Sequence, residues 1–325
     1  MTNATMKAVV APRYGSPDVL RYVDLPKPSP KDGEVLVRIR ATTVNSGDVR
    51  MRGLNVPRGL GPLVRLRMGI TRPRQPVLGI DLAGEVESVG RAVTAFRPGD
   101  RVLGSPGFAF GCHAEYRCLP GDGTIVKIPD ALSFEDAVAL PFGGSTVLAF
   151  FRRAQLKPGE TILVNGASGA VGTVAIQLAK HIGATVTAVA SGRNADLVRS
   201  LGADDFIDYT TTDFAASGAK WDVIMDNVGN APYARVKGAL KPGGRFLLVI
   251  GGLGQMIGAG LSKAIVTAGP EKDAVNARIY AELLRLWETG ALRPVIGARF
   301  PLAQAADAHR LVDTGHKVGS VVLGV

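Results

Sequence analysis

The residues with the clearest chemical meaning form a turn of small side chains near the middle of the chain. A short apolar, β-branched run at 161–165 precedes the turn and predicts a buried strand, and apolar residues at helical spacing follow from 173 to 181. Such a turn brings bare backbone and the N–H groups of a helix N-terminus against phosphate groups. Its order matches the dinucleotide-binding fingerprint, with alanine in the first glycine place. The residues that we expect at the phosphates are Ala167, Ser168, Gly169, Ala170, Val171 and Gly172.

The end of the next predicted strand, 185–190, indicates which dinucleotide is bound. An acidic residue there would bind the ribose 2′-hydroxyl of NAD, but the chain continues with Ser191, Gly192 and Arg193. A hydroxyl and a guanidinium suit a 2′-phosphate, so the sequence favours NADPH over NADH. The alternative is that Arg193 is a solvated loop residue. Asn194 is expected to cap a helix at 195–201.

The composition is that of an ordinary soluble protein with a basic balance. With 325 residues, the chain is long enough for about two domains. Its net charge of +10 is compatible with a nucleic-acid or anionic membrane partner, but also with an enzyme that binds an anionic dinucleotide. No run of about eighteen apolar residues and no secretory signal layout occurs, so we expect a cytoplasmic protein without stable membrane insertion.

The elements around the turn predict two architectures. Short alternating strands with Gly and Pro turns, at 6–10, 35–40, 85–89, 101–103 and 114–118, argue for an antiparallel barrel. From 133 on, helices at 133–140 and 145–154 and strands at 205–208, 222–225 and 245–250 predict a doubly wound parallel sheet of the α/β class. The tail, with helices at 273–289 and 303–312 and a strand at 319–325, is expected to return to the barrel. The expected domains are therefore 1–125, 126–271 and 272–325.

Ligands of doubly wound sheets bind beyond the carboxyl ends of the strands. The residues that follow the predicted strands are small, polar or compatible with phosphate, as an extended dinucleotide requires. Besides the turn, Ser191 and Arg193, the residues expected at the cofactor are Tyr209, Asn227, Gly229, Ile250, Gly251 and Gly252.

Five motifs together resemble the medium-chain dehydrogenase/reductase superfamily, and within it the zinc-free quinone reductase branch that includes zeta-crystallin. Apart from the fingerprint with Leu201-Gly202-Ala203-Asp204 and Asp208-Tyr209, they are Val44-Asn45-x-x-Asp48 with Arg52-Gly53, Leu78-Gly79-x-Asp81-x-Ala83-Gly84-Glu85-Val86, Pro98-Gly99-Asp100-Arg101-Val102 and Leu140-Pro141 through Thr146. The resemblance spans almost the whole chain. It implies a GroES-like barrel and a Rossmann domain, places Thr146 at the cofactor, and allows a homodimer.

The resemblance also carries an expectation about metal. Zinc alcohol dehydrogenases of this fold hold their catalytic zinc at three places that match Asn45, Ile80 and Phe142 here. One amide and two hydrocarbon side chains cannot hold a zinc ion that needs three protein ligands, so we expect no metal. The group of Cys112, His113 and Cys118 resembles a remnant site, but scattered residues of this kind are typical of core and turn positions.

Without a Lewis acid, the reaction that needs least help is hydride transfer from the reduced nicotinamide to an electron-poor acceptor, a quinone or an α,β-unsaturated carbonyl. In the resembled branch, the residue that matches Asn45 lies beside the nicotinamide ribose and the substrate, which implies an amide donor to the developing oxygen anion. Asp48 is the second catalytic candidate. It and Asp81 resemble positions that line or brace the cleft, and a structural role fits them equally well.

Two other functions remain open: an enoyl-thioester or alcohol-type reductase of the same superfamily, and an NADPH-binding protein with little turnover that acts as a sensor or binds RNA. The basic stretch from Arg50 to Arg74 is either a lid, a plain surface loop with a short helix, or a membrane contact. Because this stretch contains no aromatic residue on which bases could stack, we expect no nucleic-acid partner. Segment 251–269 is expected at the substrate site or a dimer contact, and Ser320 stands where the family has a second lysine after Lys317.

Overall fold

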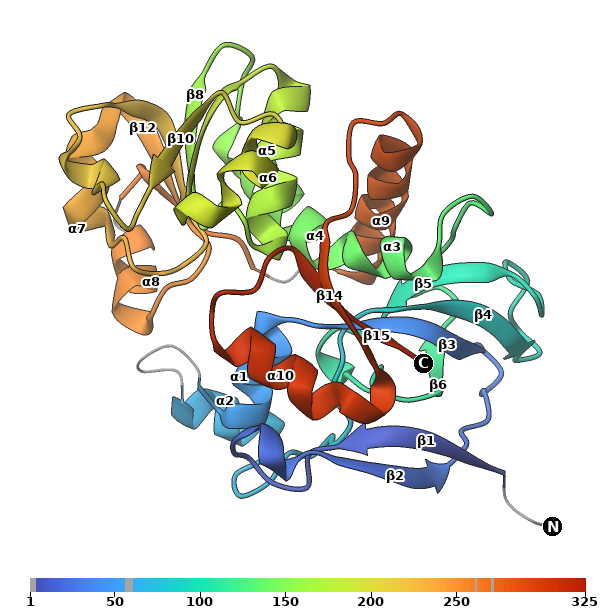
Figure 1. The fold of residues 1–325 in the computed structure, drawn as a ribbon. Helices are drawn as coiled ribbons and strands as arrows, with labels where there is room; N and C mark the ends of the chain where they lie inside the picture. The colour runs from blue at the N-terminus through green and yellow to red at the C-terminus, as the bar shows by residue number, and fades with distance from the viewer. Residues whose placement is uncertain (1–3, 56–60, 261, 270–271) are drawn as a thin grey trace.

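The computed structural model describes residues 4–55, 61–260, 262–269 and 272–325, and Arg58 of the basic stretch lies outside them. The described chain is organised around two large sheets, one above the other in Figure 1. The lower sheet is mainly antiparallel and the upper one is parallel with helices packed on it. The expected α/β class, with an antiparallel β domain beside a doubly wound sheet, is confirmed.

The lower sheet has seven strands in the order β14-β15-β3-β4-β5-β7, with β6 paired to β3. Its centre is β3, whose alternate residues Val35, Val37 and Ile39 are buried in one cluster. A separate β1-β2 pair is tied to Val77 and Ala114 by isolated bridges. The bounds are β1 Thr5–Val10, β2 Arg21–Pro26, β3 Glu34–Val44, β4 Leu82–Val89, β5 Arg101–Ser105, β6 Tyr116–Pro120, β7 Thr124–Lys127, β14 Ile296–Pro301 and β15 Ser320–Gly324.

The upper sheet has six parallel strands in the order β10-β9-β8-β11-β12-β13. Its bounds are β8 Thr161–Asn165, β9 Thr185–Ala190, β10 Asp205–Asp208, β11 Trp221–Asp226, β12 Leu240–Leu248 and β13 Ile265–Val266. The strand predicted at 245–250 overlaps β12 at residues 245–248, but β12 begins earlier, at Leu240, and its register shifts between Trp221 and Val223. Pro242, Gly243 and Gly244, residues typical of turns, lie in that irregular part of β12.

The helices connect the sheets and cover the parallel one. Their bounds are α1 Ser46–Gly53, α2 Gly61–Met68, α3 Phe134–Ala139, α4 Pro141–Ala154, α5 Ala170–Ile182, α6 Ala195–Ser200, α7 Tyr233–Val236, α8 Leu253–Gly260, α9 Asp273–Glu288 and α10 Ala305–Asp313. α4 begins at Pro141, earlier than expected, because a proline in the first helical position lacks only an N–H that would be unpaired anyway. α4 packs on α5, and α9 contacts both α4 and β7, so these helices join the two regions.

One helical segment among the described residues, Phe134–Ala154, has the length and apolar content of a membrane span. In the most apolar part of this segment, 61% is buried inside the protein. This burial is what a core helix between two packed regions requires, and it accounts for the apolar composition of α3 and α4.

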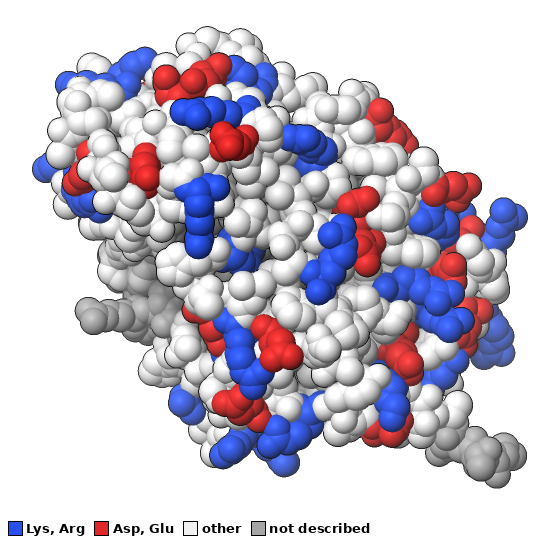
Figure 2. All heavy atoms as spheres, in the orientation of Figure 1, with Lys and Arg blue, Asp and Glu red and all other residues white. Residues whose placement is uncertain are grey.

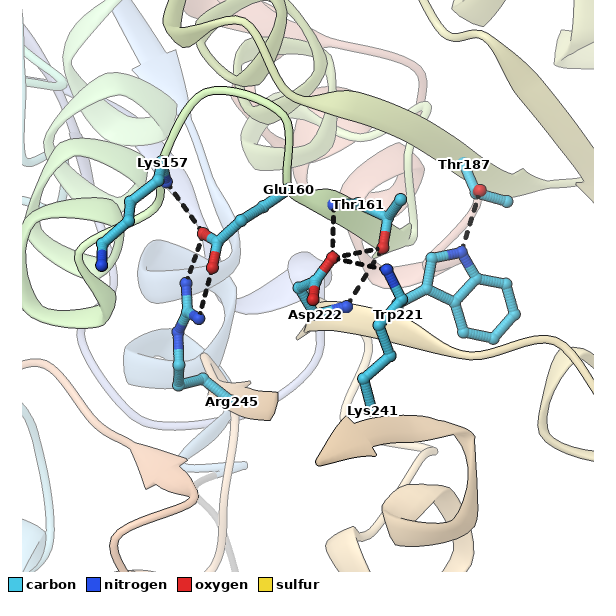
Figure 3. A network of polar contacts seen from close by, with 8 residues as sticks. All are labelled: Lys157, Glu160, Thr161, Thr187, Trp221, Asp222, Lys241 and Arg245. Atoms are coloured by element: carbon cyan, nitrogen blue, oxygen red, sulfur yellow. Dashed lines mark hydrogen bonds and ion pairs between the residues drawn. The ribbon is translucent and has the colours of Figure 1, made fainter. Parts of the chain in front are cut away.

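The amino ends of β8, β11 and β12 are held together by charged side chains, at the opposite end of the sheet from the predicted site (Figure 3). Arg245 donates two parallel hydrogen bonds to Glu160, at 2.7 and 2.6 Å. Asp222 Oδ2 accepts from the Thr161 amide, the Thr161 hydroxyl and Lys241 Nζ, each at 2.8 Å. Charge-assisted bonds of this kind stabilise the alignment of these parallel strands.

We expect Asp222→Asn to lower the free energy of unfolding by about 2 kcal/mol at neutral pH. Burial alone would raise the pKa of Asp222, but the bonds from Lys241 and Thr161 outweigh it and lower this pKa to about 2. A lowered pKa stabilises the folded state above the unfolded-state value, near 3.8, and this contribution disappears as the pH falls toward 2. The measurement is chemical denaturation of both proteins between pH 7 and pH 2. The exposed Asp205→Asn is the control, and an Asp222→Asn deficit that does not shrink with acid would contradict the assignment.

Candidate active site

A groove of about 460 Å³ follows the carboxyl ends of the central parallel strands, and the small-residue turn lines it. Gly166 has a φ of +76°, and a Cβ on Gly172 would lie 2.2 Å from the Gly166 carbonyl oxygen, so the turn is tight and needs glycine at both places. α5 begins directly at Ala170, which leaves the unpaired N–H groups of its first turn at the groove. Of the predicted phosphate-binding residues, the groove is lined by Ser168, Gly169, Ala170, Val171 and Gly172, while Ala167 is buried beneath them.

The predicted cofactor-selecting residues line the same groove. Ser191, Arg193 and Tyr209 belong to it, and the Arg193 side chain is exposed and has no ion-pair partner among the described residues. Asn194 occupies the N-cap position of α6, but its side chain does not cap the helix, contrary to expectation. Its Nδ2 donates instead to Ser168 Oγ at 3.1 Å and to Ser191 Oγ at 3.3 Å. Asn194 therefore ties the phosphate turn to the loop after β9.

The C-terminal part of the chain closes one side of the groove. β15 pairs with β3, and the Gly319 amide just before it donates to the Ser168 carbonyl at 2.8 Å. This contact brings Val312, Gly315, His316 and Lys317 to the groove. Lys317 Nζ donates to the Gly319 carbonyl at 2.7 Å, and burial lowers the pKa of Lys317 to about 8. Ser320 points away and donates to the Ala139 carbonyl at 3.2 Å, so it has a structural role.

A second cavity, of about 710 Å³, opens beside the groove. Its walls are mainly apolar and come from α4, from the loop around Phe108 and from the start of α9. The predicted cofactor residue Thr146 lies in this cavity, where its hydroxyl donates to the Phe142 carbonyl at 2.9 Å. The two cavities share six residues: Ser46, Arg50, Phe142, Val171, Asn227 and Ile250. Such a shared boundary is where a group bound in the groove can react with a molecule in the second cavity.

Asn45 lies next to this boundary but lines neither cavity. It is the N-cap of α1, and its Oδ1 accepts from the Gly47 and Asp48 amides at 2.8 and 3.2 Å. Its Nδ2 is buried and has no partner among the described residues. An unpaired buried donor costs free energy. The expected role of Asn45 as an amide donor to the substrate stays a prediction.

Asp48 and Asp81 make structural contacts in this geometry, and a catalytic role for Asp48 stays a prediction. Asp48 is fully buried, and its two oxygens accept from the Asn45 and Gly79 amides at 2.9 and 3.0 Å. Asp81 accepts from the Tyr280 hydroxyl at 2.7 Å. Burial is the main cause that raises the pKa of each carboxyl to about 7. Asp48 therefore positions Asn45 through the reciprocal cap of α1, without reaching either cavity.

The places that match zinc ligands carry no metal-binding set. Phe142, whose side chain is a hydrocarbon ring, lines both cavities. The Ile80 side chain lies close to Gly47, since a Cβ added to that glycine would be 3.2 Å from it. The group of Cys112, His113 and Cys118 does not converge, since His113 Nε2 lies 3.0 Å from the Thr43 carbonyl and Cys118 lies in β6 opposite Leu36. Across the described ranges, no three His, Cys, Asp or Glu side chains gather as metal ligands would.

Three predicted cofactor glycines do not line the groove, namely Gly229, Gly251 and Gly252. Gly229 donates its amide to Asp226 Oδ1 at 3.0 Å, and Gly251 is buried against the Leu248 side chain. The sequence analysis also missed some residues of the groove, including Asn165 and Asn230. Asn165 Nδ2 donates to Asn230 Oδ1 at 2.8 Å. Asn165 follows the buried run of β8, so a polar side chain at a strand end was the available signal.

Comparison with known proteins agrees with this geometry. The alcohol dehydrogenase GroES-like domain matches residues 31–130, and the zinc-binding dehydrogenase family matches residues 201–323. A quinone oxidoreductase from Pseudomonas aeruginosa is 34% identical, over 95% of this chain and 97% of its own length. An NADPH-dependent alkenal/one oxidoreductase from Arabidopsis thaliana is 33% identical, over 98% of this chain and 79% of its own length.

Solved structures give the same result. The quinone oxidoreductase from Coxiella burnetii superimposes with a TM-score of 0.88 at 33% identity, and the match covers 99% of this chain and all of the other. The matches in sequence and in shape cover almost the whole chain, and therefore both sheets. The chain is an oxidoreductase with a nicotinamide cofactor, and it belongs to the medium-chain dehydrogenase/reductase superfamily, in its quinone oxidoreductase branch.

Proposed function

We propose that this protein is an NADPH-dependent reductase of quinones or α,β-unsaturated carbonyls that works without zinc. The observation that carries the proposal is the shared boundary of the two cavities, where Phe142 stands at a place that matches a zinc ligand. A hydrocarbon side chain there cannot help to polarise a simple alcohol or ketone. The names of the relatives, a quinone oxidoreductase and an alkenal/one oxidoreductase, support the same acceptor classes.

The residues fit a reduced nicotinamide dinucleotide, which when bound supplies a hydride at its nicotinamide ring. The first turn of α5 and the bare backbone at Gly169 would hold the phosphates. Ser191 and Arg193 would hold a 2′-phosphate. Val171, Phe142 and Ile250 would form an apolar boundary that excludes water from the reacting centre.

The two other functions that the sequence leaves open have less support. An enoyl-thioester reductase would use the same groove, and only the acceptor distinguishes it from the proposal. An RNA-binding function would need a continuous basic surface, but on the face shown in Figure 2 Lys and Arg alternate with Asp and Glu. The cytoplasmic location and the homodimer stay predictions.

The test is oxidation of NADPH and NADH by the purified protein with a panel of quinones, enones, enoyl thioesters and simple ketones. We expect turnover of quinones or enones with NADPH, little with simple ketones, and no loss of activity after dialysis against a chelator. Turnover restricted to ketones or dependent on added zinc would contradict the proposal. Retention of nucleic acid with no turnover of any acceptor would favour the binding-protein alternative.

A further inference from the structure

Among the residues that the structure describes, Arg50 is the one charged residue on the boundary that the two cavities share. The other described members are Ser46, Phe142, Val171, Asn227 and Ile250. It lies in the last turn of α1 and is half-buried. Within residues 4–55, 61–260, 262–269 and 272–325, no carboxylate pairs with its guanidinium. A cation therefore faces the reacting centre without a counter-ion from the described chain.

The neighbouring arginines of the basic stretch are different. Arg52 is buried as well, but it donates to Asp313 at 2.6 Å and to the Gly15 carbonyl at 3.1 Å. Arg65 donates to the Ile70 carbonyl at 2.7 Å. Arg52 Nη1 is also buried without a partner, but the other donors of Arg52 bond to Asp313 and Gly15, whereas no bond to the Arg50 guanidinium occurs among the described residues. Burial lowers the pKa of the Arg50 guanidinium. A partly desolvated charge of this kind is unfavourable unless an anion completes it.

Two molecules offer an anion that can pair with Arg50: the cofactor, through its phosphates, and the acceptor. The phosphate place is the first turn of α5, and Gly169 and Gly172 line the groove only. Arg50 faces the second cavity as well, together with apolar walls that include Phe108 and Phe150. Its position thus points to the molecule in the second cavity.

Two other charged residues line that cavity, and they differ from Arg50. Among the described residues of the lining, Asp273 is the one acid, and its Oδ1 accepts from the Thr124 hydroxyl at 3.0 Å at the start of α9. Arg67, from α2, adds a second positive charge. Neither Asp273 nor Arg67 reaches the groove, so the charge at the reacting end of the cavity is positive.

We propose that Arg50 binds a negative group on the acceptor, so that the preferred acceptors are quinones or enones that carry a carboxylate beside their unsaturated system. The inference rests on the proposed function, since it names the acceptor class of that same site. The planar fork of donors on Arg50 matches a carboxylate, and the aromatic walls accommodate the carbon skeleton. Arg50 acts here in binding and selection.

The experiment compares an acid with its methyl ester, which differ only in charge and one methyl group. The reduction products 4-oxopentanoate and methyl 4-oxopentanoate are titrated by calorimetry into the protein loaded with NADP⁺, so that no turnover occurs. In parallel, kcat/KM is measured with NADPH for the unsaturated pair, trans-4-oxopent-2-enoate and its methyl ester. We expect the acid to be preferred at least about tenfold in both assays, as charge-assisted binding requires.

In Arg50→Met we expect this preference to fall to less than about threefold, and in Arg50→Lys to recover in part. Arg72→Met is the control, because Arg72 is exposed on the same basic stretch and lines neither cavity. Circular dichroism melting confirms that each variant folds. Equal binding of acid and ester to the unchanged protein, or a preference that survives in Arg50→Met, would overturn the inference.

The outcomes also separate this inference from the proposed function. Selective binding of the acid with no reduction of either acceptor would retain the anion site and reject the reductase. Equal reduction of both acceptors would retain the reductase and reject the anion site. Loss of NADPH affinity in Arg50→Met with an unchanged acid preference would assign Arg50 to the cofactor phosphates and overturn the inference.

Discussion

Replacement of Gly172 by alanine is expected to abolish cofactor binding and to lower the free energy of unfolding by about 1–3 kcal/mol. A Cβ at this position would lie 2.2 Å from the Gly166 carbonyl oxygen and 2.6 Å from the Ala167 Cα. Both contacts are backbone atoms of the turn itself, so no flexible side chain can move aside. The turn or α5 must shift, and the N–H groups of the first helical turn then no longer converge on the phosphates.

Gly169→Ala separates stability from binding. Gly169 has a φ of −79°, and its added Cβ would meet only the Gly166 carbonyl oxygen, at an ordinary 3.5 Å. This variant should retain most of its stability. Its affinity for NADPH should fall by about tenfold, because the backbone must approach the phosphates closely and the added methyl group lies at the groove. Gly254→Ala, in α8 with open space around it, is the control. The measurements are thermal melting and NADPH titration; native-like NADPH affinity in Gly172→Ala would refute the close packing of strand, turn and helix.

The parts of the fold that could be predicted from sequence are those with local signals. β8, β9 and β10 were placed at their observed bounds, because buried parallel strands read as short apolar runs between turn residues. The strands β2, β7, β13 and β14 were missed. β14 has alternating half-buried and exposed residues around Gly297 and Arg299, so its short pattern is weak without its partner β15.

The candidate site was only partly predictable, for a related reason. The turn at 167–172 carries its own signal, whereas Lys317 reaches the groove only because β15 pairs with β3 far earlier in the chain. Asn45 and Asp48 are three residues apart in the motif, and the reciprocal cap of α1 buries both. The cap leaves only the Asn45 Nδ2 without a partner among the described atoms of these two side chains. Arg50 is one cation among several in the basic stretch, and only its place on the lining of both cavities distinguishes it.

Arg193→Gln is expected to reduce the preference for NADPH over NADH by about tenfold to a hundredfold, with NADH affinity almost unchanged. Arg193 lines the far end of the groove with Ser191 and Tyr209, and no described carboxylate pairs with it. Asp208 contacts the same loop at Gly192, but it does not line the groove, and Thr210 donates to its Oδ1 through both amide and hydroxyl. The selecting charge at this end of the groove is therefore positive, and only NADPH carries a 2′-phosphate for it.

The comparison uses steady-state kinetics and equilibrium titration with both cofactors, on the unchanged protein, Arg193→Gln and Arg199→Gln. Arg199 is exposed on α6 and stacks over Phe206, so its removal changes the net charge equally without touching the groove. If Arg199→Gln lowered NADPH affinity as much as Arg193→Gln, the long-range field of a basic protein would be responsible, and raising the ionic strength would remove both effects. If Arg193→Gln alone lowers NADPH affinity and the loss persists at high salt, a direct bond to the 2′-phosphate is required, because screening weakens distant charges more than a paired fork of donors.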